Sequence, residues 1–210
     1  MLYADLYQRK IELDRYVREK DCRACGFHSR EDFLEKLHRG DIRGEGCISV
    51  DPQRLKALQL AARPDEILPK VKVLQLPAPA PPGIFPLNHP DPDSPVLVSG
   101  NSQLTIEVLL AVLATTVSPF WYLVVDTDGH TVDMALIYQT LTAERILNAL
   151  TREAMDQKVT LPKMVIPGLA VSLQEEIANL TGWSVQVGPI CAVELPLYFG
   201  PAWQIESEVR

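Results

Sequence analysis

Three of the four cysteines in this 210-residue chain lie in one short polar stretch near the N-terminus, with the spacing Cys22-x2-Cys25-x21-Cys47. Two thiolates separated by two residues can bind one metal centre, and a third thiolate from a later loop can supply another ligand. His28 is close enough in sequence to reach the same centre through its imidazole. The pattern predicts a metal or iron–sulfur site, and partly buried thiols without metal are the ordinary alternative.

A second group of candidate residues follows short apolar segments in the C-terminal half. Each segment ends in small or polar residues, namely Gly100-Asn101-Ser102, Asp126-Thr127-Asp128-Gly129, Ile166-Pro167-Gly168 and Gly188-Pro189. Parallel strands would bring these ends to one edge of a sheet, which is where such sheets bind ligands. Glycine there lets the backbone approach a ligand closely. A ligand site at this edge is predicted, and simple turn chemistry is the alternative.

Hydrophobic patterning predicts the elements that position these residues. Residues 2–20 and 52–62 have helical spacing, and residues 30–39 form a predicted helix between an N-cap at Ser29 and a stop at Gly40. Further helices are predicted over 104–116, 142–155 and 173–182, and strands over 95–100, 120–129, 163–168 and 183–189. Strands that alternate with helices predict a Rossmann-like α/β domain of order β-α-β-α-β-α-β with a mainly parallel sheet.

A proline-rich stretch separates two parts of the chain. Ten of the 17 prolines lie between Pro64 and Pro95. Because proline has no N–H donor, residues 76–95 cannot form a helix or an interior strand. We therefore predict a helical cysteine-bearing module at 1–66, a linker at 67–94 and an α/β domain at 95–210. The linker is either extended and semi-rigid, or held along a domain surface by Ile84, Phe85 and Leu87.

Composition narrows the functional classes. A net charge of −7 and a pI of about 5.1 argue against a nucleic-acid partner bound through a general basic surface. The longest apolar run, residues 104–117, is shorter than a membrane span and contains Glu107. The N-terminus lacks the apolar core of a signal peptide, so we expect a cytoplasmic protein without a membrane partner. The sequence contains neither a phosphate loop nor a GxGxxG motif.

The cysteine pattern resembles the [4Fe-4S] module of the large (gamma) subunit of the corrinoid iron–sulfur protein of acetyl-CoA synthesis. That family has the spacing C-x2-C-x4-C-x16-C, with a glycine after the second cysteine. The segments DCRACGFHSREDFLEKL and GEGC place Cys22, Cys25 and Cys47 at the first, second and fourth positions, and Arg30 at the third. Three interpretations stay open: a cluster with three thiolates and a foreign fourth ligand, a zinc site that adds His28, or a relic without metal.

Residues 95–210 resemble the C-terminal domain of the same subunit, which is also similar to the corrinoid protein of mercury methylation. The stretches PVLVSGNSQLT, YLVVDTDGHTV, LTAERI, MVIPGLA and TGWSVQVGPICAVELPLYF occur in the family's order and spacing, without the family's central barrel. The resemblance implies that the loops after the strands hold a corrinoid (cobalamin), through hydroxyl, amide and small residues. The implied positions are Gly100, Asn101, Ser102, Asp126, Thr127, Thr131, Val132, Met134, Ala135, Pro167, Gly168, Ala170, Gly188 and Ala192.

The segment DGHTVDMALIYQT resembles the family's cap beneath cobalt, approximately DG-x-[SN]-V-x-[TC]-A. Met134 occupies the position that faces cobalt, and Gln139 and Thr140 replace a glycine and a lysine. A thioether is a soft, weak ligand and a bulky apolar filler. Met134 therefore lies under the metal without binding it, or fills a pocket that has lost its cofactor.

By this resemblance the chain is a corrinoid-binding protein that serves methyl-group transfer or corrinoid reduction in one-carbon metabolism. It would be a methyl carrier rather than a stand-alone enzyme, and its partner would be a methyltransferase or another corrinoid protein. Two alternatives belong to other classes. One is a non-catalytic docking or assembly partner that has lost one or both cofactors, and the other is a zinc-stabilised adaptor.

Overall fold

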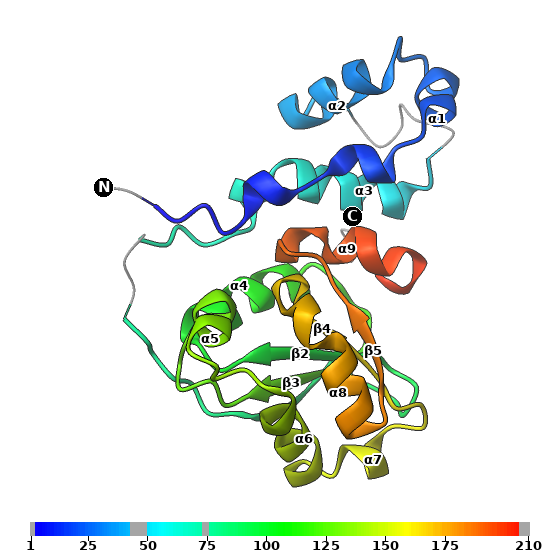
Figure 1. Cartoon of the computed structure of the whole chain (residues 1–210). Coiled ribbons are helices and arrows are strands. Elements are labelled where there is room, and N and C mark those ends of the chain that lie inside the picture. The colour runs from blue at the N-terminus through cyan, green and yellow to red at the C-terminus, as the bar shows by residue number, and fades with distance from the viewer. Residues whose placement is uncertain (1–2, 43–49, 73–75, 206–210) are drawn as a thin grey trace. The chain divides into compact units, whose positions relative to one another are not determined.

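The computed structural model describes residues 3–42, 50–72 and 76–205, and the chain divides into two compact units (Figure 1). The first unit combines residues 1–71, 111–117 and 191–210, and the second combines residues 72–110 and 118–190. The module boundaries predicted after residues 66 and 94 come from the sequence pattern, whereas the two units are defined by contacts between residues in the structure. The predicted boundaries stay a prediction. Within the described ranges, no helix has the length and apolar character needed to cross a bilayer.

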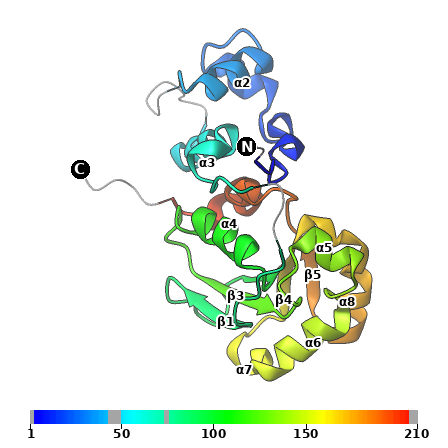
Figure 2. The ribbon, with the colours of Figure 1, turned by 90° about the vertical axis from the view of Figure 1, so that its left-hand side faces the viewer.

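The second unit is built on a five-stranded sheet of order β1-β3-β2-β4-β5 (Figure 2). Strands β2 (Val96–Gly100), β3 (Phe120–Val125), β4 (Lys163–Ile166) and β5 (Ser184–Val187) are parallel to one another. Their apolar side chains are almost all buried, as expected of a parallel sheet. The predicted α/β fold with a mainly parallel sheet is confirmed.

The fifth strand comes from the proline-rich stretch. β1 (Gly83–Leu87) pairs antiparallel with β3, in the register Gly83↔Val124 to Leu87↔Phe120. It lies at the edge of the sheet, where Pro86 is tolerated because one side of an edge strand has no ladder to complete. Phe85 of this strand also contacts Tyr122, with 6.3 Å between the ring centroids.

The main core lies on one face of the sheet. Val98, Leu123 and Ile166 point to this face and pack with apolar residues of α5 (Val132–Ile137), α6 (Ala143–Arg152), α7 (Met155–Lys158) and α8 (Gln174–Thr181). Side chains alternate along a strand, so Tyr122 points to the opposite face. Its hydroxyl hydrogen-bonds to that of Ser99 at 2.6 Å, and burial raises the pKa of the phenol. The helix α4 (Gln103–Leu113) connects β2 to β3.

A capping side chain and a glycine mark helix ends in this unit. Thr142 Oγ1 accepts the backbone N–H of Arg145 at 3.3 Å at the start of α6, and Gly182 ends α8 with φ 72°. α6 ends earlier than the predicted helix over 142–155, because Ala154 has φ 48° and breaks the helical ladder before α7. η5 (Gly168–Leu173) follows β4 as 3-10 turns.

In the first unit, two predicted helices are confirmed. α2 (Arg30–Arg39) begins where Ser29 Oγ accepts the N–H of Asp32 at 3.2 Å, and it ends at Gly40 with φ 75°. α3 (Pro52–Ala62) begins where Asp51 Oδ1 accepts the N–H groups of Gln53 and Arg54. α3 packs against α9 (Leu195–Phe199), which lies between the short turns η6 (Ala192–Glu194) and η7 (Gly200–Ala202).

The helix predicted over residues 2–20 is wrong. That segment contains two 3-10 turns, η1 (Gln8–Lys10) and η2 (Leu13–Tyr16), and α1 (Glu19–Ala24) begins only near its end. Leu6 and Tyr7 have φ values of 48° and 62°, which no α-helix accommodates. Leu13 and Val17 are buried, and Leu6 and Ile11 are half-buried, although the segment is mostly not helical. A further 3-10 turn, η4 (Pro64–Glu66), follows α3.

Candidate functional site

At the carboxyl ends of β2 and β3, the side chain of Asn101 connects two loops. Its Oδ1 accepts the backbone N–H groups of Thr127 at 2.8 Å and Gly129 at 3.0 Å. Its Nδ2 donates to the carbonyl oxygen of Ala80 at 3.0 Å and to Oδ1 of Asp126 at 3.2 Å. Asn101 and Thr127 are both buried. The polar groups of Asn101 therefore hold the two loops together, and its predicted contact with a ligand stays a prediction.

The glycines of this edge allow the protein's own backbone to pack closely. A Cβ on Gly100 would lie 2.6 Å from Oγ1 of Thr127. A Cβ on Gly168 would lie 2.6 Å from backbone atoms of Pro189 and Ile190, and the Gly168 N–H donates to the Pro189 carbonyl at 3.1 Å. Gly188 similarly lies against Ile166. These contacts fix the loops after β4 and β5 to each other.

Residues 78–80, here called the crossing segment, lie across the carboxyl ends of β2 and β3. The Ala80 N–H donates to the Asn101 carbonyl at 2.8 Å, and the Gln103 N–H donates to the Ala78 carbonyl at 2.9 Å. Pro79 forms an isolated bridge with Ser102 and lies where a Cβ on Gly129 would be. The crossing segment thus covers this half of the predicted site, including Ser102, with the protein's own backbone.

The predicted cap forms α5 and the turn before it. Thr131 is the N-cap, and its hydroxyl donates to the Asp133 carboxylate. Ala135 is fully buried in the core, and Val132 packs against the core at its edge. Met134 is half-buried on the other side of the helix. α5 lies beside the carboxyl end of β2 and packs against η5 (Figure 1).

Exposed apolar side chains gather on the elements around α5. Ile137 is 71% exposed, Tyr138 58%, Val171 57% and Ile190 42%, and we call these four residues the apolar face. They lie on three neighbouring segments, because α5 packs on η5 and the backbone of Ile190 contacts Gly168 at the start of η5. Large exposed apolar side chains on adjacent segments indicate a binding surface. The apolar face is therefore the candidate binding surface beside this edge of the sheet.

His130 lies in the loop between β3 and α5. Its Nδ1 lies 2.9 Å from the carbonyl oxygen of Thr127 and 3.3 Å from Oγ1 of Thr140. Its ring packs on that of Tyr138, with 5.0 Å between the centroids. Sequence reasoning missed His130 and the apolar face, although His130 directly follows Gly129 in a predicted ligand loop.

The remaining sequence-predicted positions are divided between the two units. Pro167 precedes η5, and Ala170 is buried in the core of the second unit. Ala192 begins η6 in the first unit. The acidic loop after β3 is held by Arg145, which donates to the Asp126 carbonyl at 2.9 Å and pairs with the Asp128 carboxylate at 3.1 Å.

The predicted cysteine site lies in the first unit, except for Cys47, which is outside the described residues. Cys22 is buried in α1, and Cys25 is disulfide-bonded. His28 is exposed, and its backbone N–H donates to Asp32 at 3.1 Å. Among the described residues, no three His, Cys, Asp or Glu side chains are grouped as metal ligands would be. The metal site therefore stays a prediction.

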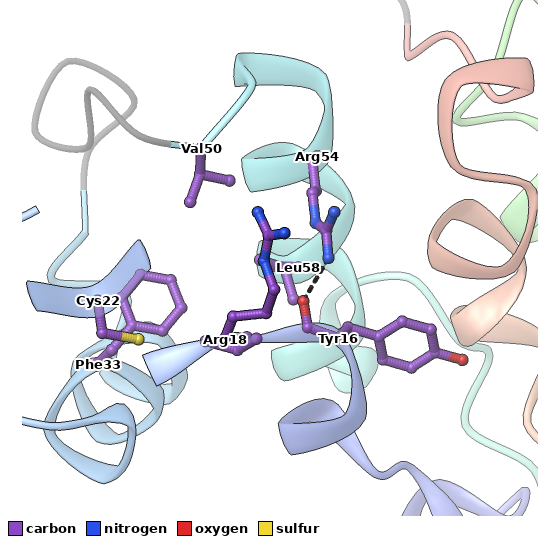
Figure 3. A pocket seen from close by; sticks show the side chains of 8 residues that line it. Tyr16, Arg18, Cys22, Phe33, Val50, Arg54 and Leu58 are labelled. Carbon is purple, nitrogen blue, oxygen red and sulfur yellow. Dashed lines mark hydrogen bonds between the residues drawn. The ribbon is translucent and has the colours of Figure 1, made fainter. Parts of the chain in front are cut away.

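A small pocket adjoins Cys22 in this unit (Figure 3). Its lining is mixed, with Phe33 beside Cys22 and the guanidinium groups of Arg18 and Arg54 on another side. The Arg54 side chain donates to the Tyr16 carbonyl at 2.6 Å. The other lining residues are Tyr16, Val17, Val50 and Leu58. The side chain of Arg30, which replaces the family's third cysteine, pairs with Glu31 at 3.9 Å and does not line this pocket.

Comparison with known proteins identifies a family for the greater part of this chain. The family model described as the CO dehydrogenase/acetyl-CoA synthase delta subunit matches residues 65–198. The chain is 33% identical over 115 residues to the acetyl-CoA decarbonylase/synthase complex subunit gamma of Methanopyrus kandleri, a match that covers 55% of this chain and 25% of that protein.

Two further relatives have the same name apart from numbering. The subunit gamma of Archaeoglobus fulgidus is 35% identical over 109 residues, covering 52% of this chain and 23% of that protein. The subunit gamma 2 of Methanosarcina thermophila is 35% identical over 122 residues, covering 57% and 26% respectively. The resemblance inferred from the sequence is confirmed, and the chain spans about a quarter of the length of these curated relatives.

Proposed function

Because this chain belongs to the CO dehydrogenase/acetyl-CoA synthase delta subunit family, we propose that its α/β unit binds a corrinoid at the carboxyl edge of the sheet. The protein would serve methyl-group transfer or corrinoid reduction, as a carrier that works with a methyltransferase or a second corrinoid protein. Family membership supports a role in this branch of one-carbon metabolism. The corrinoid as cofactor, and methyl-group transfer or corrinoid reduction as the reaction, are what we propose beyond that role.

The apolar face is the observation that carries the proposal. A corrin ring is broad and mostly apolar, with amide groups only at its fringe, so it requires an apolar surface with polar groups around it. Ile137, Val171 and Ile190 offer such a surface next to loops that end in glycine. Asp126 and Asp128 are exposed at the same edge, where they can accept hydrogen bonds from ring amides.

The residues of this edge would have different tasks. The Asn101 and Thr127 network and the close contact of Gly168 with Ile190 hold the loops in place. The apolar face would exclude water from one side of the ring. When bound, the cobalt supplies a nucleophile that accepts a methyl cation equivalent from a donor and releases it to an acceptor. The protein's part is to bind and orient the ring.

Met134 would lie beneath the ring as an apolar support. It is half-buried on the outward side of α5, where the helical spacing also places Tyr138 one turn later. A thioether is a weak donor for cobalt compared with nitrogen ligands. Replacing Met134 by leucine should therefore change corrinoid binding little.

A binding experiment with matched variants tests the proposal. Cobinamide or hydroxocobalamin is added to the purified chain, and bound corrinoid is measured by absorbance after gel filtration. Ile137→Asp should weaken binding by about 10–100-fold, because burying a side chain of this size contributes about 1.5–3 kcal/mol. Leu161→Asp is the control, because Leu161 is 65% exposed but precedes β4 and so lies at the opposite edge of the sheet.

Two results would contradict the corrinoid proposal. One is no corrinoid retained by the wild-type chain, and the other is equal loss in the Ile137 and Leu161 variants. In the first case the apolar face would instead serve a docking or assembly partner, which capture of a methyltransferase by the cofactor-less chain would support. The apolar character of the face favours that second candidate over a zinc-stabilised adaptor.

The N-terminal cysteines call for a separate measurement. We propose that Cys22, Cys25 and Cys47 hold a cluster or a zinc ion in the reduced protein, with His28 as the added ligand in the zinc case. Elemental analysis after anaerobic purification distinguishes the two, since iron with sulfide indicates a cluster and zinc without iron indicates the zinc site. A chain with neither metal would contradict both.

A further inference from the structure

We propose that His130 is a positioning residue of the apolar face, which holds the C-terminal end of α5 and the ring of Tyr138 in the orientation that binds a corrinoid. The inference rests on the proposed function, because it concerns corrinoid binding by the apolar face. It gives a role to a residue that the resemblance leaves without one. It requires no contact between His130 and the cofactor.

The helix α5 is too short to hold itself in place. It has six residues, and isolated helices shorter than about 12–15 residues are marginal in water. Ala135 anchors the helix in the core, whereas Ile137 and Tyr138 are exposed at its C-terminal end. The chain leaves the helix through Gln139, whose φ of 56° is uncommon for a residue other than glycine. The orientation of this end of the apolar face therefore depends on contacts from other segments.

The backbone of His130 is fixed by hydrogen bonds in the loop between β3 and α5. Oδ1 of Asn101, at the end of β2, accepts the N–H groups of Thr127 and Gly129. The His130 N–H donates to the Thr127 carbonyl at 3.1 Å, and Oγ1 of Thr127 hydrogen-bonds to the His130 carbonyl oxygen at 3.0 Å. Thr127 and Gly129 are both buried. The side chain of His130 thus extends from a backbone that is tied to the sheet.

The imidazole connects this loop to the segment that follows α5. Nδ1 of His130 donates its proton to the Thr127 carbonyl oxygen at 2.9 Å, because a carbonyl oxygen only accepts. Oγ1 of Thr140 lies 3.3 Å from the same nitrogen. Thr140 is itself buried, and its N–H donates to the Ala135 carbonyl at 2.8 Å. The two ends of the short helix are therefore joined through one side chain.

The ring of His130 also supports Tyr138 directly. The two ring centroids are 5.0 Å apart, and the ring planes meet at 35°. Aromatic rings at such a distance attract each other beyond the effect of the area that they bury. Tyr138 is still 58% exposed, so most of its ring stays open to a ligand. Without the imidazole, ligand binding would include the entropic cost of ordering the Tyr138 side chain.

A double-mutant cycle on cobinamide binding tests whether His130 acts through Tyr138. The dissociation constant is measured by absorbance titration for the wild type, His130→Ala, Tyr138→Ala and the double variant. His130→Ala should weaken binding by about 3–10-fold in the wild-type background, as expected for the loss of one aromatic contact. In the Tyr138→Ala background the same change should have an effect below about twofold, because no ring is left to position.

Two further substitutions separate the ring of His130 from its hydrogen bond. His130→Phe should bind cobinamide within about twofold of the wild type, because it keeps a ring beside Tyr138 and the Thr127 carbonyl keeps the backbone N–H of position 130. His130→Asn keeps a side-chain N–H but has no ring, and it should bind as weakly as His130→Ala. His38→Ala should leave binding unchanged, and it is a matched control because Nδ1 of His38 also contacts a backbone carbonyl, that of Leu34 at 2.7 Å, in the first unit.

The outcomes separate this inference from the proposed function. Unchanged binding in His130→Ala, or equal losses in the two backgrounds, overturns the positioning role and leaves corrinoid binding in place. Failure of the wild-type chain to retain cobinamide overturns both. If urea unfolding shows that His130→Ala is not folded, the comparison of His130→Phe with His130→Asn still decides. Tighter binding by the phenylalanine variant supports the role of the ring, and equal binding by the two overturns it.

Discussion

Replacing Asn101 by alanine should destabilise the α/β unit far more than an average surface substitution. Its side-chain oxygen accepts the backbone N–H groups of Thr127 and Gly129, and both hydrogen bonds are buried. A buried donor left without an acceptor costs about 1–3 kcal/mol, so the loss of the one oxygen that both N–H donors share costs about 2–6 kcal/mol. The carbonyl of Ala80 also loses its donor from Asn101. Such a loss is a large part of the total stability of a typical domain.

Urea unfolding followed by circular dichroism measures this effect. The free energy of unfolding is obtained by linear extrapolation for the wild type, Asn101→Ala and Asn148→Ala. Asn148 is the matched control, because it is exposed on α6 and its replacement by the same residue should change stability by no more than about 0.5 kcal/mol. The midpoint should move with an unchanged slope if only the native state is affected.

A small change in the free energy of unfolding would refute the idea that Asn101 holds the two loops together. A loss below about 1 kcal/mol, the lower bound for even one buried donor without a partner, would mean that water or a loop shift replaces both hydrogen bonds. The loops after β2 and β3 would then be mobile enough to present Asn101 to a ligand, as the sequence pattern alone predicts.

Three other predictions concern the glycine contact and the buried groups of the first unit. Gly168→Ala should lower the free energy of unfolding in urea by about 1–3 kcal/mol, because the added Cβ meets backbone atoms of Pro189 and Ile190. An unchanged midpoint would mean that this loop moves to accommodate the Cβ. Burial raises the pKa of the Glu194 carboxyl. Its contribution to stability is therefore present below the ordinary pKa of 4.5 and is lost as pH rises through the raised pKa of the folded state. The Tm of Glu194→Gln should fall less than that of the wild type over this pH range, and an identical fall would contradict the assignment. Burial raises the pKa of the Cys191 thiol to about 11, so alkylation by iodoacetamide at neutral pH, followed by mass spectrometry, should be slow until urea unfolds the chain.

Local signals were sufficient for most of the fold. The predicted cap at Ser29 gave the start of α2 correctly, because its side chain satisfies an N–H group that the helix itself cannot. The helix predicted over residues 2–20 was wrong, because helical spacing of apolar residues does not reveal the positive φ values at Leu6 and Tyr7. Tertiary contacts, not local preference, decide the conformation there.

The proline-rich stretch shows a different limit. Proline excludes an interior strand but permits an edge strand, so the sequence left open whether residues 83–87 pair with anything. Only the register with β3 reveals that they do. The crossing segment was equally hidden, because its hydrogen bonds come from backbone atoms of Ala78 and Ala80, which carry no sequence signature.

Residue type indicated the edge of the sheet as a site but not what each side chain does there. Asn101, Thr127 and the glycines were predicted as ligand contacts, whereas their atoms meet one another in the structure. The contact between the His130 ring and the Thr127 carbonyl likewise has no sequence signature, because a carbonyl is present at every position of the chain. The sequence therefore predicts which polar residues lie near a site, but not the direction in which each polar group points.

The hydrogen bonds within this edge of the sheet affect how selective the proposed corrinoid site would be. Since the buried amide of Asn101 is occupied by the protein itself, few polar groups at this edge are able to distinguish one corrin fringe from another. An apolar face alone accepts any broad, flat macrocycle, because apolar burial has no direction. Preference for one macrocycle over another would then have to come from the exposed carboxylates of Asp126 and Asp128, which the proposed function places at the fringe of the ring.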